Sequence, residues 1–336
     1  MKTNFKFLKY FFLTIFCLII GVFSLNNLID PLWYNNGNKL KDINYSWDER
    51  SQILNRFFKI YKKNDINCLI FGSSTSTIIN VKNIKNYKCI NFSFSAGSLD
   101  EFELLLLYLK KYIEPEVIII EINFNLPEKK NPKIDKLLPN YIFSDTKKNR
   151  FVNYLKDYLS LKCLIFSIKS ILDMPNLLNA YDKNFEPFVL KDKAKKYKNY
   201  INLSLKKEPN EIFFSNAKTY QKLQDLYPST FFIGFIHPFH PKYPINRYKS
   251  NNLDNFISTA HSISENFDRF YDFSLPSEIN FNPENTYDGS HYYSDVYKLV
   301  VDKIFEQEKI NYGYRVVKFK EYKEKYIGAI LKYNEN

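Results

Sequence analysis

Short apolar runs alternate with helix-length segments from about residue 66 onward, and this alternation limits the folds open to the chain more than any other feature. Such an order predicts a parallel sheet with helices on both faces. We expect strands in five runs, of which the last is the weakest: INCLIFG (66–72), KCINFSFS (88–95), EVIIIEINF (116–124), TFFIGFI (230–236) and FDRFYDF (267–273). We expect helices at 99–113, 252–266 and 293–309.

Residues 127–228 interrupt this rhythm with a polar, proline-bearing link followed by apolar helical sequence. We interpret them as an insertion that either caps the carboxyl edge of the sheet or covers it without a role in binding. The expected organisation is a cytoplasmic N-terminus and transmembrane anchor (1–30), a membrane-proximal linker (31–65), an α/β domain (66–309) that holds the insertion, and a C-terminal extension (310–336).

The first 30 residues hold three lysines and then an uncharged run from Tyr10 to Ile29. About 20 apolar residues are enough for a helix to cross a bilayer. Lysines before the run and Asp30 after it favour an N-terminus inside the cell and the remaining chain outside. A cleaved signal peptide is the alternative, since Val22 and Ser24 form a tolerable cleavage site. Either way, we expect an extracytoplasmic protein, and the favoured form is a single-pass membrane protein.

The four cysteines could form disulfides in that compartment. Cys17 lies in the apolar run and Cys163 in a predicted helix. Cys68 and Cys89 each lie in a predicted strand, where we expect buried thiols, with a bridge between the two as the alternative.

The formal net charge of +12 would suit a polyanionic partner. However, the lysines are spread along the chain, and there is no zinc-spaced Cys/His cluster, glycine-rich phosphate loop or basic aromatic RNA-binding signature. We therefore expect no nucleic-acid partner, no bound metal and no cofactor.

The segment FGSSTS (71–76) places small hydroxyl residues where the first predicted strand ends. Ligands of open parallel sheets bind outside the carboxyl ends of the strands, so these hydroxyls are expected to face a crevice. Gly72 permits a tight turn there, and the backbone amides after it can face a negative oxygen. The alternative is that Ser73 to Ser76 only cap the next helix.

A serine becomes a useful nucleophile beside a base that a carboxylate orients. His291 lies three residues after Asp288, an offset that can bring the carboxylate to the imidazole on a turn. His237 and His240 follow the fourth predicted strand without an acidic neighbour in sequence, and we interpret them as possible substrate-binding residues. His261 lies in a predicted helix, where surface exposure or packing explains it.

FGSSTS, the segment NFSFSAGS after the second predicted strand, and the C-terminal Asp-x-x-His together resemble the motifs of the SGNH/GDSL hydrolase superfamily. More narrowly, they resemble its membrane-anchored, extracytoplasmic branch, which includes the D-alanyl transfer protein of teichoic-acid modification and SGNH-like proteins of alginate O-acetylation. The resemblance covers about 66–124 and 230–307. It implies a flavodoxin-like, three-layer α/β fold with a parallel sheet, preceded by one transmembrane helix.

The resemblance also implies a catalytic role for each matched residue. Ser74 matches the nucleophile, and Ser73 replaces the usual aspartate, a change that also occurs in the anchored branch. We include Ser73 among the possible substrate-binding residues. Asp288 matches the orienting acid and His291 the general base.

An oxyanion hole is implied by the same resemblance. The backbone N–H of Ala96 or Gly97 would join that of Ser74 as a donor. The asparagine block is the weakest match, because Gly-x-Asn-Asp is absent and the candidate amide is Asn125 or Asn123. The oxyanion hole is therefore incomplete or built differently.

The resemblance implies acyl transfer through an acyl-serine, most simply O-acetylation of a cell-surface polysaccharide or wall polymer. Such enzymes often work with a multispanning membrane acyltransferase that delivers the acyl group. An esterase or deacetylase would use the same residues with water as acceptor, and the difference depends on how well the site excludes water. A non-catalytic polysaccharide-assembly protein on the same scaffold is the third interpretation.

Overall fold

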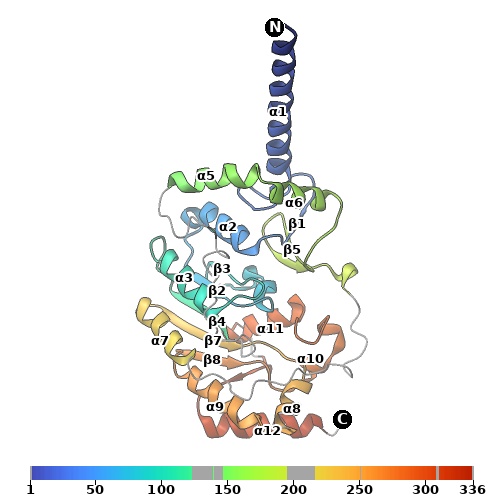
Figure 1. Cartoon of the computed structure of the whole chain (residues 1–336). Coiled ribbons are helices and arrows are strands. Elements are labelled where there is room, and N and C mark those ends of the chain that lie inside the picture. The colour runs from blue at the N-terminus through green and yellow to red at the C-terminus, as the bar shows by residue number, and fades with distance from the viewer. Residues whose placement is uncertain are drawn as a thin grey trace. The chain divides into compact units, whose positions relative to one another are not determined.

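The computed structural model describes residues 2–122, 139, 147–194, 216–249, 251–307 and 310–334 (Figure 1). The chain forms two compact units. Unit one consists of Met1–Ile60 with Asp135–Phe188, and unit two consists of Tyr61–Ile134 with Val189–Asn336.

Unit two is built on a six-stranded sheet with the order β3-β2-β4-β7-β8-β9. The strands from β3 through β8 are parallel, and β9 joins antiparallel at the edge. Taken in chain order, the five parallel strands have the arrangement 2-1-3-4-5 found in flavodoxin-like sheets. The expected parallel sheet is confirmed for these five strands, while the antiparallel edge strand β9 was not predicted. The bounds are β2 Cys68–Phe71, β3 Cys89–Asn91, β4 Val117–Ile122, β7 Phe231–Ile236, β8 Arg269–Asp272 and β9 Tyr314–Arg315.

The central strands are buried on both faces. Every residue of β2 and β4 is buried, which is the environment that continuous β-branched and aromatic runs favour. One residue departs from this composition, because β4 contains Glu121 beside Ile120 and Ile122. A fully buried carboxylate in a strand requires partners of its own.

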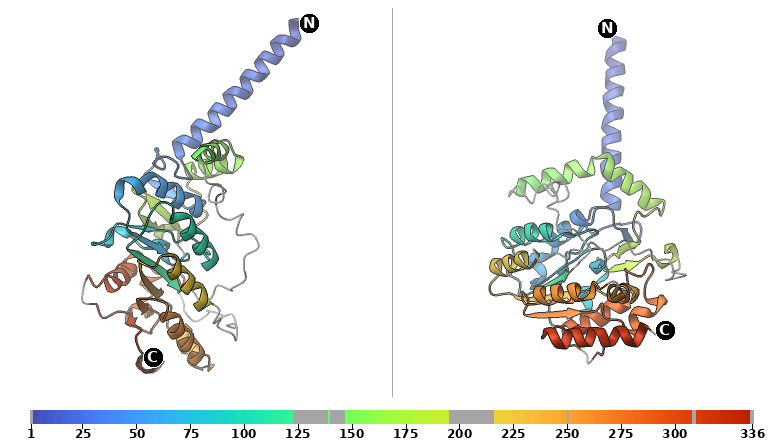
Figure 2. Two further views of the ribbon diagram at one scale, coloured as in Figure 1. Left: turned by 90° about the vertical axis from the view of Figure 1, so that its left-hand side faces the viewer. Right: turned by 60° about the horizontal axis from the view of Figure 1, so that its bottom comes forward.

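Helices cover both faces of this sheet, with α11 on the face opposite α3, α7 and α9 (Figure 2). Helix α3 begins shortly after β3, and its N-terminus is capped. The Glu101 carboxylate accepts hydrogen bonds of 3.1 Å from both the N–H and the hydroxyl of Ser98. The expected helices at 99–113, 252–266 and 293–309 are confirmed with slightly shorter bounds. The helices of unit two are η1 Ser76–Ile78, η2 Val81–Asn83, α3 Leu99–Leu109, η4 Lys191–Lys193, α7 Asn216–Leu226, α8 Lys242–Lys249, α9 Leu253–Ser264, α10 Glu278–Phe281, η6 Pro283–Asn285, α11 Ser294–Ile304 and α12 Phe319–Asn334.

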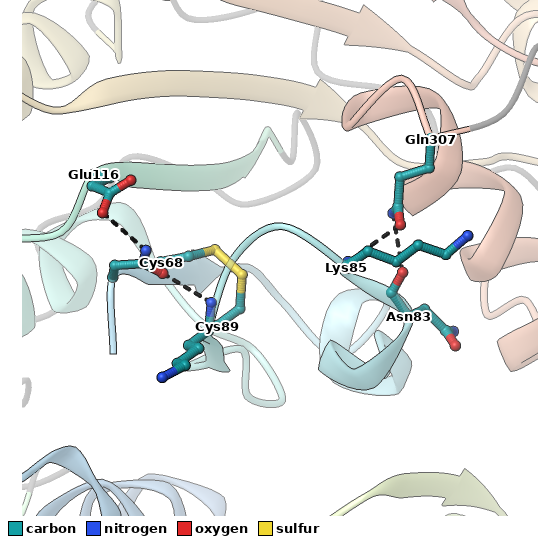
Figure 3. The surroundings of a disulfide bond; sticks show 8 residues. Cys68, Asn83, Lys85, Cys89, Glu116 and Gln307 are labelled. Carbon is teal, nitrogen blue, oxygen red and sulfur yellow. Dashed lines mark hydrogen bonds between the residues drawn. A yellow bond between two sulfur atoms is a disulfide. The ribbon is translucent and has the colours of Figure 1, made fainter. Parts of the chain in front are cut away.

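A disulfide joins Cys68 and Cys89, so the expectation of two buried thiols is wrong and the alternative holds (Figure 3). The two residues are register partners on β2 and β3, with Cα atoms 4.2 Å apart. Pairing of these adjacent strands brings the two sulfur atoms within bonding range. The bridge joins residues separated by 21 positions and closes a loop that contains FGSSTS.

Unit one contains the N-terminal helix and a small sheet of order β1-β5-β6. Its core includes Leu32, Tyr158, Cys163 and Phe166. The elements are α1 Lys2–Ile29, β1 Ile43–Tyr45, α2 Glu49–Asn64, α5 Lys147–Tyr158, α6 Leu161–Ile171, β5 Asn179–Asp182 and β6 Pro187–Val189, of which α2 and β6 extend past the unit boundaries. The units therefore divide the chain differently from the expected domains: the expected linker 31–65 holds β1 and α2, and the expected insertion contributes residues to both units.

Within the described residues, one helical segment is long and apolar enough to cross a membrane. It runs from Phe5 to Ile29 and has a mean hydropathy of 2.2. This finding is compatible with the expected single-pass anchor, although a signal sequence has the same length and composition.

Candidate active site at the carboxyl ends of β2 and β4

A chain of hydrogen bonds links three of the predicted catalytic residues. Ser74 Oγ lies 2.8 Å from His291 Nε2, and His291 Nδ1 lies 2.6 Å from Asp288 Oδ2. Ser74 follows β2, whereas Asp288 and His291 lie in the segment before α11. The three side chains are partly exposed, so a substrate carbonyl can approach the serine hydroxyl.

The segment that carries Asp288 and His291 is a tight turn. Asp288 Oδ1 accepts hydrogen bonds from the backbone N–H groups of Ser290 and His291 at 2.9 and 2.7 Å, so one carboxylate holds both the turn and the imidazole. Gly289 adopts a φ angle of +84°, which a residue with a side chain disfavours. Tyr287 stacks on the His291 ring with 5.4 Å between centroids.

The electrostatics of this turn favour an ionised aspartate. Partial burial opposes the charge, but the hydrogen bond and the proximity of His291 outweigh burial and lower the pKa of Asp288. The ionised Asp288 carboxylate accepts a hydrogen bond from the Nδ1–H group of His291. The proton of the neutral imidazole is then on Nδ1, so the unprotonated Nε2 faces Ser74, which is the arrangement a general base requires.

A second carboxylate, Glu121, organises the other side of the FGSSTS loop. It is fully buried at the carboxyl end of β4 and accepts hydrogen bonds from the Ser73 N–H at 2.9 Å and the Ser73 hydroxyl at 3.0 Å. The hydroxyls of Thr75 and Ser76 also donate to it. The residues on both sides of Ser74 are thus fixed through one carboxylate, while Ser74 itself points to His291.

His237 completes the surroundings of Glu121, with Nδ1 2.8 Å from Oε1. Burial by itself would raise the pKa of Glu121, but the electrostatic attraction of His237 and the hydrogen bonds from Ser76 and Thr75 outweigh it and lower that pKa to about 2. Glu121 is therefore a permanent anion at physiological pH.

The reason for a glycine at position 72 differs from the expected one. Gly72 does not adopt a positive φ angle, so turn geometry does not require it. Instead, a Cβ atom there would lie 2.6 Å from Glu121 Oε2 and 2.6 Å from Ser76 Cβ. Gly72 is needed because Glu121 and the hydroxyl loop fill the space that a side chain would take.

The predicted oxyanion donors are distinguished by their hydrogen bonds. The Gly97 N–H donates to Phe94 O at 3.0 Å, whereas the N–H groups of Ser74 and Ala96 have no acceptor among the described residues. Ala96 adopts a φ angle of +53° in the loop after β3. Asn123 and Asn125 lie outside the described residues.

The predicted substrate-binding residues are buried. The Ser73 hydroxyl bonds to Glu121, and His237 lies against the same carboxylate. His240 packs on the Phe281 ring, and burial together with Lys242 lowers the pKa of its imidazole to about 4. This placement suits a role in supporting the loops better than direct contact with a substrate. Among the residues that the structure describes, no group of three or more His, Cys, Asp or Glu side chains is arranged to hold a metal ion.

Comparisons with known proteins add little to this geometry. No protein-family model matches the chain, and no curated protein matches it at a significant level. One similar solved structure has a description that names a candidate platelet activating factor from Streptococcus pneumonia. It shares 13% identity, covers 77% of this chain and 92% of its own, and has a TM-score of 0.36. A likeness at this level carries no argument about activity, so the site is interpreted from its own contacts.

No motif in the sequence assigns a role at the site to Glu121, Thr75 or Gly289. A signal for Glu121 was present, since an acidic residue inside an otherwise apolar, buried strand needs compensating partners. The partners of Glu121 are far away in sequence and follow other strands. They can be identified only once the sheet order is known, in which β2 and β4 are neighbours. This neighbourhood corresponds to the switch point at which doubly wound sheets bind ligands.

Proposed function

We propose that this protein is a serine-dependent acyltransferase that moves an acyl group to a hydroxyl acceptor through an acyl-serine. The observation that carries the proposal is the hydrogen-bond chain from Ser74 through His291 to Asp288 at the carboxyl edge of the sheet. The resemblance of the three motifs to the SGNH/GDSL superfamily supports the same chemistry.

The proposed reaction has two half-reactions. Ser74 Oγ attacks an ester or thioester carbonyl while His291 Nε2 takes the hydroxyl proton. The N–H groups of Ser74 and Ala96 stabilise the oxyanion, the bond to the leaving group breaks, and His291 returns its proton to that group. An acceptor hydroxyl then loses its proton to His291 and attacks the acyl-serine, which restores the Ser74 hydroxyl.

Asp288 and Glu121 have different parts in this proposal. Asp288 holds the His291 tautomer and stabilises the imidazolium that forms in each half-reaction. Glu121 touches neither the substrate nor the reacting atoms, so we assign it a positioning role through Ser73, Thr75 and Ser76.

The proposed location is the outer face of the cell membrane, with α1 as a retained anchor. Two observations support it. The Cys68–Cys89 disulfide is typical of an oxidising compartment. Phe23 contacts the rings of Tyr154 and Tyr158, and a cleavage after Ser24 would remove it from the core of unit one. The acceptor that fits this location is a surface polysaccharide or wall polymer, and a multispanning acyltransferase could supply the acyl group.

Hydrolysis is a second candidate, since the partial exposure of Ser74 and His291 lets water reach an acyl-serine as readily as a polymer hydroxyl. An esterase would use the same residues and differ only in its acceptor.

Covalent labelling tests the shared chemistry. Full-length protein in detergent is incubated with a fluorophosphonate and followed by intact mass. We expect one adduct in the wild type, none in Ser74→Ala, slow labelling in His291→Ala and wild-type labelling in the control Ser258→Ala. Equal labelling of wild type and Ser74→Ala would overturn the proposal.

A second assay separates transfer from hydrolysis. Protein acylated with p-nitrophenyl acetate is mixed with polysaccharide fragments, and acetate is measured on the fragments and in solution. Transfer predicts acetylated fragments and little free acetate, whereas release of free acetate at the same rate with and without fragments would establish the esterase.

A further inference from the structure

Helices α5 and α6 of unit one carry an exposed apolar surface. We call it the α5–α6 face, and it is formed by Phe151, Leu159, Leu161, Ile165, Ile168 and Leu172. Along α6 and its C-terminal cap residue, the exposed apolar positions 161, 165, 168 and 172 follow helical spacing and form one stripe, beside which Ile171 is also exposed. The opposite side of α6 is buried and contains Cys163, Phe166, Ser167 and Ser170. The helix therefore has one side covered by unit one and, opposite it, an exposed apolar side.

The same helices hold the last turns of α1. Asn26 is fully buried; its side chain donates to Tyr158 O at 2.8 Å and accepts from the Ser167 hydroxyl at 2.7 Å. Figure 1 shows α5 and α6 (green) across the foot of α1 (blue), at the point where the helix leaves the unit. The α5–α6 face is therefore at a fixed height along α1.

The length of α1 sets that height relative to a bilayer. The uncharged run begins at Tyr10, and α1 reaches the α5–α6 contacts at Phe23. This stretch rises only about 20 Å at 1.5 Å per residue. A bilayer has a hydrocarbon core of about 30 Å, so even with Lys6 and Lys9 extended toward the surface the helix brings α5 and α6 into the interface.

From these contacts and this length, we propose that the α5–α6 face lies in the lipid head-group region of the leaflet at which α1 ends. Amphipathic helices in this position bury their apolar side about 5–10 Å below the surface. Residues 147–171 include six basic residues and one acidic residue, a balance that suits anionic lipids. The inference rests on α1 spanning the membrane, as proposed above, but holds for either orientation of α1.

Insertion of the α5–α6 face would fix the orientation of unit one relative to the membrane. A rigid attachment of this kind differs from a flexible tether, because α5 and α6 limit how far unit one can tilt about the end of α1. The distance between the bilayer and unit one is then fixed by packing and not by chain length.

Depth-dependent fluorescence quenching tests this inference. Leu161→Trp and Ile168→Trp are placed in the full chain, one chain per lipid nanodisc, with brominated lipids as quenchers and the unsubstituted protein as background. We expect the added tryptophans to lose more fluorescence to lipids brominated near the head group than to lipids brominated at the acyl-chain end, because interfacial helices lie about 5–10 Å below the surface. Circular dichroism confirms that each variant is folded.

Two control positions show whether an absence of quenching at 161 and 168 concerns the α5–α6 face or the membrane anchor itself. Phe12→Trp, on the exposed part of α1, reports whether α1 spans the bilayer, and Val317→Trp, exposed in unit two, reports general adsorption. Quenching at position 12 without quenching at 161 or 168 overturns the inference and leaves the anchor intact. No quenching at position 12 overturns the anchor itself. Shielding of 161 and 168 that appears only when nanodiscs hold two chains would instead make the face a self-association surface and overturn the lipid assignment.

Discussion

Two histidine–carboxylate pairs lie near the FGSSTS loop, and their surroundings differ. Asp288 and His291 are partly exposed, and His291 contacts Ser74, the residue that the proposed chemistry uses. Glu121 and His237 are fully buried, and Glu121 accepts hydrogen bonds from Ser73 and Thr75, the residues on both sides of Ser74. Similar groups thus take different roles because of burial and neighbours: the exposed pair can move a proton, and the buried pair fixes the loop.

The largest effect should follow from removing the exposed carboxylate. Asp288→Asn keeps the size of the side chain but no longer stabilises the imidazolium or the required His291 tautomer, so we expect the labelling rate of Ser74 to fall by ~10³–10⁴-fold. Stability should change little, because the pair is partly exposed to water. Labelling kinetics and urea unfolding of the same sample check both statements, and a wild-type labelling rate would remove Asp288 from the mechanism.

Removing the buried carboxylate should have the next largest effect, on stability. Glu121→Ala leaves three hydroxyl residues without their acceptor and removes the carboxylate beside the buried His237 imidazole. Breaking a buried pair in this way costs ~3–5 kcal/mol in the free energy of unfolding. The matched control is Glu116→Ala, since Glu116 bonds to Asn67 on the surface and should cost less than ~1 kcal/mol. Similar losses in the two variants, measured by urea unfolding, would contradict the role of Glu121.

Acid should weaken the buried pair in a defined pH range. The pKa of Glu121 is lowered in the folded protein from 4.5 to about 2, so its contribution is complete above pH 4.5 and is lost as the pH falls toward 2. This shift corresponds to about 3 kcal/mol. The lowered pKa of Asp288 acts in the same direction.

The contribution of Glu121 can be isolated by measuring the free energies of unfolding of the wild type and Glu121→Gln from pH 6 to pH 2. We expect the variant to lose less stability over that range, because it has no carboxylate to protonate at position 121. Parallel curves for the two proteins would show that Glu121 does not titrate as described.

The smallest effect is expected from crowding the buried pair. In Gly72→Ala the new methyl group meets Glu121 and Ser76, and overpacking of this kind costs ~1–3 kcal/mol. Gly328→Ala is the control, because nothing lies within 4 Å of a Cβ at that position of α12. If Gly72→Ala unfolds at the same urea concentration as Gly328→Ala, space is not the reason for the glycine.

The sequence predicted those features that depend on local pattern. The buried strand β2 is a continuous apolar run, and β4 is one apart from Glu121. The offset between Asp288 and His291 fits within one turn. The two-residue strand β9 has no pattern of its own, because it forms only by pairing with β8.

The contacts of Glu121 could not be predicted, because they depend on which strands are neighbours and not on sequence distance. Ser73 lies 48 positions before Glu121, and the acidic residue was visible without its partners. The disulfide required the β2–β3 register in the same way, since Cys68 and Cys89 meet only when these strands align. The separation of 217 residues between Ser74 and His291 shows why their pairing rested on a motif resemblance.

Formation of an acyl-serine at Ser74 is tested most directly by locating the acyl group after the full-length protein reacts with p-nitrophenyl acetate. Intact mass followed by fragmentation identifies the acetylated residue. We expect one acetyl group on Ser74, absent from Ser74→Ala, formed slowly in Asp288→Asn and released when a hydroxyl acceptor is added. Acetyl groups on lysines alone, or the same adduct in Ser74→Ala, would contradict it.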